Sequence, residues 1–211
     1  MTAAEIRPWF QPLDKSQEKA VQAIARADVT ILLGGAGSGK THVAVACALN
    51  AVALSQTKRI FLTRPNVTVG RDLGHLPGEL DDKLGPWMEP IRDVLSQMSF
   101  VDFNALPFEN VALQHIRGRS FTEAYGLLDE AQNLTEVEIT AYLTRLGRAG
   151  KLILCGDVDQ CDIYNSALWD VSERLKGLAK VETVWLRGQH RNPTITAMLK
   201  RLDETREYAD V

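Results

Sequence analysis

Brief runs of apolar and β-branched residues recur along the chain, separated by longer segments with the composition of helices. Runs of this length, bounded by turn residues, are typical of strands buried in a parallel sheet. One run alternates apolar and polar positions instead, which predicts a strand with a single buried face. The predicted strands are residues 29–33, 59–63, 111–116 (the alternating run), 124–128, 151–155 and 181–186.

Helical patterns occupy most of the connections between these strands. The predicted helices cover residues 13–27, 41–55 and 87–98, and further helices begin near residues 135 and 192. The segment 87–98 places its apolar residues on one face, as a helix that packs on a core or docks on a surface does. Strands that alternate with helices in this way predict an α/β domain with a central, mostly parallel sheet and helices on both faces.

Side chains that cap helix N-termini mark three of the helix starts. The sequence Thr-Glu-Val-Glu at 135–138 is a capping box, and Asn192 precedes a proline in the first helical position. Asp14 is the expected cap of the first helix. Gln17 then fits two roles: it completes a capping box with Asp14, or it presents its amide to the edge of an adenine. Spacing slightly favours the cap.

Composition limits the number of domains, the kind of compartment and the kind of polyanion site, but it does not indicate a function. The 211 residues suit one domain, or one domain with an insertion, and the net charge of −3 means that any polyanion site must be a local patch. Cys47 and Cys155 lie in apolar runs, so we expect buried thiols, no disulfide and a reducing compartment. The first twelve residues lack a signal pattern, and no run is long enough to span a membrane.

The connection between the strand at 29–33 and the helix at 41–55 matches the phosphate-loop pattern G-x-x-x-x-G-K-[ST]. Glycines let successive backbone N–H groups face a phosphate, and the N-terminal end of the following helix favours the same anion. Lys40 supplies a cation to the β- and γ-phosphates, and the Thr41 hydroxyl can bind Mg²⁺. The residues expected to contact the nucleotide here are Gly34, Gly35, Ala36, Gly37, Ser38, Gly39, Lys40, Thr41 and His42.

Adjacent carboxylates follow the buried strand at 124–128. Asp129 is placed to bind the same Mg²⁺ as Thr41, and Glu130 to orient or deprotonate an attacking water. The next strand, 151–155, leads to Gln160, which either senses the γ-phosphate or belongs to an ordinary polar loop. Because parallel strands end at one edge of a sheet, all these residues are expected there.

Arginines follow two of the predicted strands. Arg64 comes after the strand at 59–63, Arg71 lies in a long irregular stretch at 67–80, and Arg117 follows the predicted strand at 111–116. Pairs of arginines in turns are most often solvated. The three together are also a candidate patch for a polyanion such as a nucleic acid.

These motifs, in this order, resemble those of PhoH-like ATPases. The matching segments are 34–41, 63–65, 76–78, 117–119, 129–133, 143–147 and 156–160. The family is itself similar to the first motor domain of superfamily-one helicases, in which a glutamine placed like Gln17 contacts adenine. The resemblance implies a single P-loop NTPase (RecA-like) domain over 1–211, with an N-terminal extension (1–12) and an insertion (65–120).

The resemblance further implies a cytoplasmic ATPase that uses ATP and Mg²⁺ and is linked to RNA metabolism. We therefore predict ATP hydrolysis coupled to binding or unwinding of single-stranded RNA, with DNA a second possible substrate. The alternative is an ATP-driven switch or assembly factor that acts on a protein partner. The PIN nuclease that some relatives carry is not inferred, because few residues precede the first helix. The segment 189–193 departs from the family pattern, which weakens any role carried over to Arg191.

In superfamily-one helicases, ATP binds between two motor domains, and the second domain closes the site. A single motor domain of this type lacks that second domain. We therefore expect a homo-oligomeric ring, a hexamer by analogy with the family, in which a neighbouring subunit completes the site. The candidate arginines for contacting the neighbour's γ-phosphate are Arg145 and Arg191, with Arg148 a weaker candidate.

Overall fold

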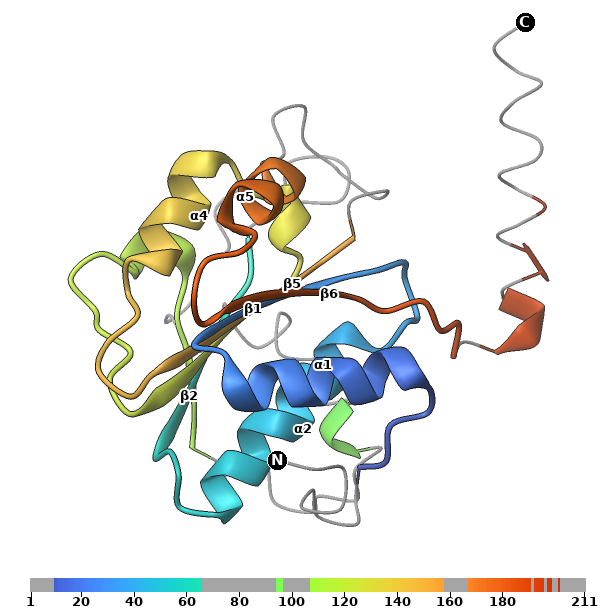
Figure 1. Ribbon diagram of the computed structural model, residues 1–211, viewed down its shortest axis with the longest axis horizontal. Coiled ribbons are helices and arrows are strands. Elements are labelled where there is room, and N and C mark those ends of the chain that lie inside the picture. Colours follow the sequence, from blue (N-terminus) through green and yellow to red (C-terminus); the bar gives the residue numbers. More distant parts are fainter. Residues whose placement is uncertain are drawn as a thin grey trace, which may run out of the picture.

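A six-stranded parallel sheet forms the centre of the computed structural model, which describes residues 10–65, 94–96, 107–157, 167–190, 192–195, 197–198 and 201 (Figure 1). The strand order is β3-β2-β4-β5-β1-β6, and every pairing is parallel. The strands are β1 (Val29–Leu33), β2 (Arg59–Thr63), β3 (Phe108–Asn110), β4 (Ala124–Leu128), β5 (Lys151–Gly156) and β6 (Val181–Trp185). The predicted α/β fold is confirmed, and the carboxyl ends of all these strands meet at one edge.

Helices cover both faces of the sheet (Figure 1). The lower face in the figure carries α1 (Lys15–Arg26) and α2 (Lys40–Ala53), and the upper face carries α4 (Glu136–Leu143) and α5 (Leu168–Leu175). Short 3₁₀ turns are η3 (Leu113–His115) and η4 (Ala131–Asn133). Strand β1 shows how the layers form: Leu32 packs into one hydrophobic cluster, and Ile31 and Leu33 pack into the other. The period-two alternation of a strand thus supplies two cores.

The predicted helix caps are present. The Asp14 carboxylate accepts hydrogen bonds from the backbone N–H groups of Ser16 and Gln17, and Thr135 forms a capping box with Glu138. The side chain of Asn192 accepts from the N–H of Thr194 at 2.9 Å. Each of these side chains satisfies N–H groups that have no partner within the helix.

The predicted strand at 111–116 is wrong. Strand β3 lies earlier, and only Val111 extends the pairing, through its N–H to Leu62 O at 2.8 Å. The chain then turns through η3. Val111, Ala112 and Ile116 are all buried, at 3%, 6% and 1% exposed. These apolar residues are buried by a turn that leads away from the sheet. Over six residues, the apolar pattern of a strand and that of a 3₁₀ turn are similar, so the sequence did not distinguish them.

Cys47 and Cys155 are buried free thiols, as predicted. Of the predicted helix at 87–98, only residues 94–96 are described; they are helical, and Leu95 is buried. The irregular stretch at 67–80, Arg71, Gln160 and Arg191 lie outside the described residues. Within the described part of the chain, the helices are all too short or too polar to cross a membrane.

Candidate nucleotide-binding site

The phosphate loop joins β1 to α2 at the carboxyl edge of the sheet. Gly39 caps α2 in the left-handed conformation, with φ of 86°, and a Cβ there would lie 2.6 Å from Gln17 Nε2. A Cβ on Gly34 would lie 2.4 Å from the carbonyl oxygen of Leu186. Glycine is therefore required at both positions by backbone conformation or close packing. The loop directs the N-terminus of α2 at the space above it, as an anion site needs.

The ammonium group of Lys40 lies over this loop. Its Nζ donates to the carbonyl oxygens of Gly34 at 2.6 Å and Gly35 at 3.0 Å. These contacts keep the charge beside the backbone N–H groups that face a phosphate. The sequence expectation that Lys40 and the loop glycines form one anion-binding unit fits this geometry.

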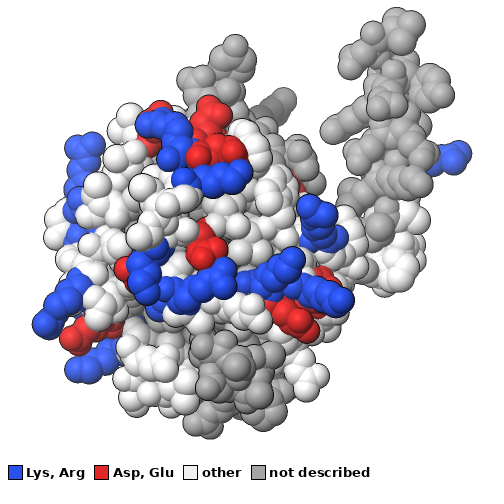
Figure 2. Space-filling model, in the orientation of Figure 1, with Lys and Arg blue, Asp and Glu red and all other residues white. Residues whose placement is uncertain are grey.

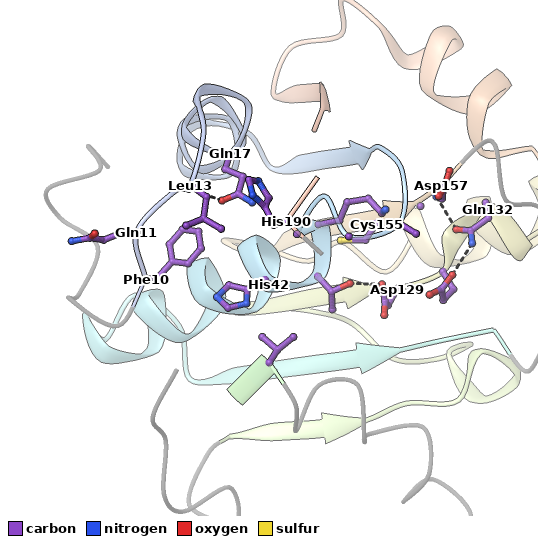
Figure 3. A pocket seen from close by; sticks show the side chains of 18 residues that line it. Phe10, Gln11, Leu13, Gln17, His42, Asp129, Gln132, Cys155, Asp157 and His190 are labelled. Carbon is purple, nitrogen blue, oxygen red and sulfur yellow. Dashed lines mark hydrogen bonds between the residues drawn. The ribbon is translucent and has the colours of Figure 1, made fainter. Parts of the chain in front are cut away.

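Thr41 and Asp129 meet although 88 positions separate them in the chain. The Thr41 hydroxyl donates a 2.9 Å hydrogen bond to Asp129 Oδ1 (Figure 3). The Asp129 residue is 6% exposed; burial raises the pKa of its carboxyl group, and the nearby Arg64 guanidinium opposes that rise. The meeting follows from the fold, because α2 begins and β4 ends at the same sheet edge.

A hydroxyl and a carboxylate this close are suitable ligands for Mg²⁺, which prefers hard oxygen donors. Within the described ranges, no group of three or more His, Cys, Asp or Glu residues forms a metal site. A Mg²⁺ ion in nucleotide sites usually takes one or two carboxylates and completes its shell with phosphates and waters. Thr41 and Asp129 fit that kind of ion.

Glu130 adopts a left-handed backbone conformation, with φ of 55°, at the start of η4. Such a conformation is uncommon outside glycine and is often found at functional sites. Its Oε2 accepts a 2.6 Å hydrogen bond from Gln132 Nε2, and Gln132 Oε1 accepts from Asp157 N at 3.0 Å (Figure 3). The carboxylate is thereby linked to the end of β5. Neither Gln132 nor Asp157 was predicted as a site residue. Both lie in segments that match the family, Gln132 in 129–133 and Asp157 in 156–160.

A cavity of about 850 Å³ extends from the phosphate loop toward the start of α1. One end holds the loop residues, Asp129 and Glu130. The other end is lined by Phe10, Leu13, Gln17, His42 and His190, together with Val94 (Figure 3). The rings of Phe10 and His42 lie 5.5 Å apart at 34°. Burial lowers the pKa of His42, which favours its uncharged ring. This end can therefore accommodate a flat, largely apolar group.

Gln17 belongs both to the start of α1 and to the cavity. Its Oε1 accepts from the N–H of Leu13 at 2.9 Å, one residue before the predicted capping-box partner Asp14. Its Nε2 donates to the carbonyl oxygen of Ser38 at 3.0 Å, and the residue is 2% exposed. Gln17 therefore does not complete the predicted capping box with Asp14, because its oxygen accepts from Leu13 instead. Its amide still secures the helix start and lines the cavity.

The segment after β6 closes one side of the cavity. The N–H of His190 donates to Gly37 O at 3.0 Å, and its Nε2 lies 2.7 Å from Asp14 Oδ2. Burial raises the pKa of Asp14, but hydrogen bonds from Ser16, Gln17 and His190 outweigh it and lower the pKa to about 2. Phe10 and His190 were not identified from sequence as site residues, although His190 lies in the segment 189–193 that was compared with the family pattern.

The predicted arginines fall in different places. Arg64 contacts Asp129 and Glu130 at the nucleotide edge. Arg117 is exposed on the connection between β3 and β4, where it follows η3 and not a strand. Over the face in Figure 2, Lys and Arg side chains are interspersed with fewer Asp and Glu side chains.

Arg145 and Arg148 lie at the amino edge of the sheet, opposite their own phosphate loop. They precede β5, and their carbonyl oxygens accept from Phe121 and Glu123, just before β4. The Arg145 guanidinium donates to Ala141 O at 3.1 Å and Arg119 O at 3.3 Å. The side chain of Arg148 is 85% exposed and lies 3.6 Å from Glu123. Both arginines therefore lie at the sheet edge away from the nucleotide site of this chain.

A family model described as "PhoH-like protein" matches residues 10–201. The chain is 36% identical over 198 residues to the PhoH-like protein of Bacillus subtilis, covering 89% of this chain and 62% of the relative. It is 34% identical over 178 residues to Protein PhoH of Escherichia coli, covering 81% of this chain and 50% of that protein. The chain thus spans about half to three fifths of the length of these relatives.

Among solved structures, the fold is similar to the large terminase from a thermophilic bacteriophage. The TM-score is 0.56 at 14% identity, and the match covers 90% of this chain and 50% of the terminase chain. Identity this low supports the shared fold alone.

Proposed function

Because this chain belongs to the PhoH-like protein family and has the fold of a P-loop ATPase, we propose that it hydrolyses ATP with Mg²⁺ and couples hydrolysis to binding of single-stranded RNA. The observation that carries the proposal is the 2.9 Å contact between Thr41 Oγ1 and Asp129 Oδ1, beside Lys40 and Glu130 in one cavity. In this proposal, the Lys40 ammonium, the Thr41 and Asp129 oxygens and the Glu130 carboxylate surround the space for a triphosphate.

The protein residues divide the chemistry among them. Lys40 and the N-terminus of α2 bind the phosphates, and Thr41 and Asp129 hold the metal ion. The ion would neutralise charge that develops on the phosphate oxygens. Glu130 then orients a water toward the γ-phosphate and accepts its proton, while Gln132 keeps the carboxylate in place.

The end of the cavity beside the start of α1 suits the adenine. Gln17 donates one of its two amide N–H groups to Ser38, which leaves the other N–H for a ring nitrogen of the base. Its Oε1 has a second lone pair for an exocyclic amine. The rings of Phe10 and His42 provide the apolar surface against which a base packs.

Single-stranded RNA is the proposed partner because of the family resemblance and because Arg64 follows β2 at the nucleotide edge. Arg64, Arg71 and Arg117 are the proposed contacts, with DNA as the competing polyanion. An ATPase assay with and without poly-uridine tests the coupling, with poly-deoxythymidine as the matched DNA and EDTA as the metal control. Stimulation by poly-uridine is expected. An ATPase rate that neither polymer changes would favour an ATP-driven switch that acts on a protein partner.

We also propose a cytoplasmic homo-oligomeric ring, with six subunits as the working number. Its support is that Arg145 and Arg148 lie at the sheet edge opposite their own phosphate loop. A head-to-tail contact between these two edges is heterologous and closes into a ring when the rotation allows it. Arg145, or Arg191, would then contact the γ-phosphate of the neighbouring subunit. Sedimentation with and without ATP analogue measures the number of subunits.

A further inference from the structure

Arg64 occupies a position fixed by the register of the central sheet. Strands β2 and β4 are neighbours, with Thr63 opposite Leu128, and the N–H of Asp129 donates to Thr63 O at 3.0 Å. Arg64, the residue after β2, therefore lies beside Asp129, the residue after β4. Arg64 Nε is 3.4 Å from Asp129 Oδ2, and its Nη2 is 3.3 Å from Glu130 Oε1.

The guanidinium of Arg64 compensates a charge that the site would otherwise leave buried. Asp129 is 6% exposed, and its Oδ1 accepts a hydrogen bond from the uncharged Thr41 hydroxyl. A buried carboxylate without a cation is costly, so the site without nucleotide needs a positive group beside Asp129. The Arg64 side chain is 20% exposed, so it lies between this site and the surface.

The contacts of Arg64 with the Asp129 and Glu130 carboxylates are long for charge-assisted hydrogen bonds, which are usually about 2.7–2.9 Å. They are loose ion pairs, which a stronger cation can replace. A Mg²⁺ ion held by Asp129 would repel a guanidinium on the same carboxylate. Arg64 and a bound metal ion therefore compete for Asp129.

We propose that Arg64 is a placeholder cation, which holds Asp129 and Glu130 while the site is empty and leaves Asp129 when metal and nucleotide bind. This inference rests on the proposed nucleotide function and adds a regulatory role to the same site. The released guanidinium becomes available to a polyanion at the sheet edge. By linkage, metal–nucleotide and single-stranded RNA then strengthen each other's binding through this one side chain.

The test measures binding of a non-hydrolysable ATP analogue by fluorescence, with Mg²⁺ and with EDTA. In Arg64→Ala, affinity should rise about tenfold with Mg²⁺, within the usual range of coupling between sites. With EDTA it should stay within about twofold of the parent, because no metal then competes with Arg64. Arg64→Lys keeps the charge, so its affinity for the analogue with Mg²⁺ should lie between those of the parent and Arg64→Ala. Arg174→Ala, which removes an exposed ion pair between Arg174 on α5 and Glu136 on α4, is the matched loss of one arginine and should bind like the parent.

The second measurement is the affinity for poly-uridine with and without the analogue and Mg²⁺. The parent should bind poly-uridine more tightly in the loaded state, and Arg64→Ala should lose that difference. Thermal unfolding confirms that each variant is folded, and Arg64→Lys serves if the alanine variant is not. Equal weakening of analogue binding with Mg²⁺ and with EDTA would make Arg64 an ordinary phosphate ligand and overturn the inference alone. No analogue binding by the parent would overturn the proposed function as well.

Discussion

The side-chain amide of Gln132 donates a 2.6 Å hydrogen bond to the carboxylate of Glu130. The same amide accepts from the N–H of Asp157, so Glu130 is tied to the end of β5. Gln132 is 3% exposed, and a Cβ on Gly156 would lie 3.1 Å from both its backbone nitrogen and its Oε1. Gln132 is thus a positioning residue, held by packing on one side and by hydrogen bonds on the other.

Gln132→Ala should lower the turnover number about tenfold, because an unanchored general base loses part of its usual contribution. The KM for ATP should change little, since Gln132 is not expected to bind the phosphates. Steady-state ATPase kinetics separate the two parameters. If KM rises as much as turnover falls, Gln132 instead supports the nucleotide pocket.

Lys40→Ala should abolish hydrolysis and strongly weaken nucleotide binding, because the loop loses its mobile cation. Binding of a fluorescent ATP analogue and phosphate release are the two measurements. Lys176→Ala, which removes an exposed lysine that pairs with Glu173, is the control for the loss of one positive charge. Hydrolysis at the parent rate in Lys40→Ala would show that the loop does not bind phosphate.

Glu130→Gln should still bind Mg²⁺-ATP but turn it over about 10² to 10⁴ times more slowly, the usual loss for a positioned base. The amide is similar in size and cannot accept the water proton in the same way. Single-turnover kinetics with saturating enzyme report the chemical step directly. A parallel loss of nucleotide affinity would assign Glu130 to the metal or to the structure.

Asp14 should make stability depend on pH in the acid range. Its pKa is lowered from 3.8 to about 2 in the folded protein, so its stabilising effect is complete above about 3.8 and is lost as the pH falls through about 2. Asp14→Asn keeps an acceptor for the helix cap and does not titrate. The thermal stability of the parent should therefore fall toward that of Asp14→Asn over this window, as measured by circular dichroism. A difference independent of pH would contradict the assignment.

The proposed ring predicts complementation between inactive chains. Arg145→Ala removes the candidate trans arginine, and Lys40→Ala removes the phosphate-binding cation. Mixed rings contain interfaces with an intact site on one subunit and an intact arginine on its neighbour. They should recover part of an activity that an arginine in trans can raise about 10³ to 10⁵ times. Arg148→Ala mixed in the same way tests the weaker candidate. Full activity of a strictly monomeric protein would rule the arrangement out.

The local elements of this protein follow from its sequence alone. The phosphate loop lies between a buried strand and a helix, so its glycines, Lys40 and Thr41 needed only neighbouring residues to be identified. The same holds for Asp129 and Glu130, which directly follow the apolar strand β4. In a parallel sheet every strand end reaches one edge, so order along the chain was enough to predict that Thr41 and Asp129 would meet.

The tertiary structure alone decided the features that depend on contacts between distant segments. Only the pairing of β2 with β4 brings Arg64 to the carboxylates. Only the folding of residues before α1 and after β6 onto the phosphate loop brings Phe10 and His190 into the cavity. The run at 111–116 forms a turn and not a strand, because a turn buries its apolar residues as well as a strand would. Periodicity and spacing describe neighbours along the chain, whereas strand order and register determine which distant side chains share a site.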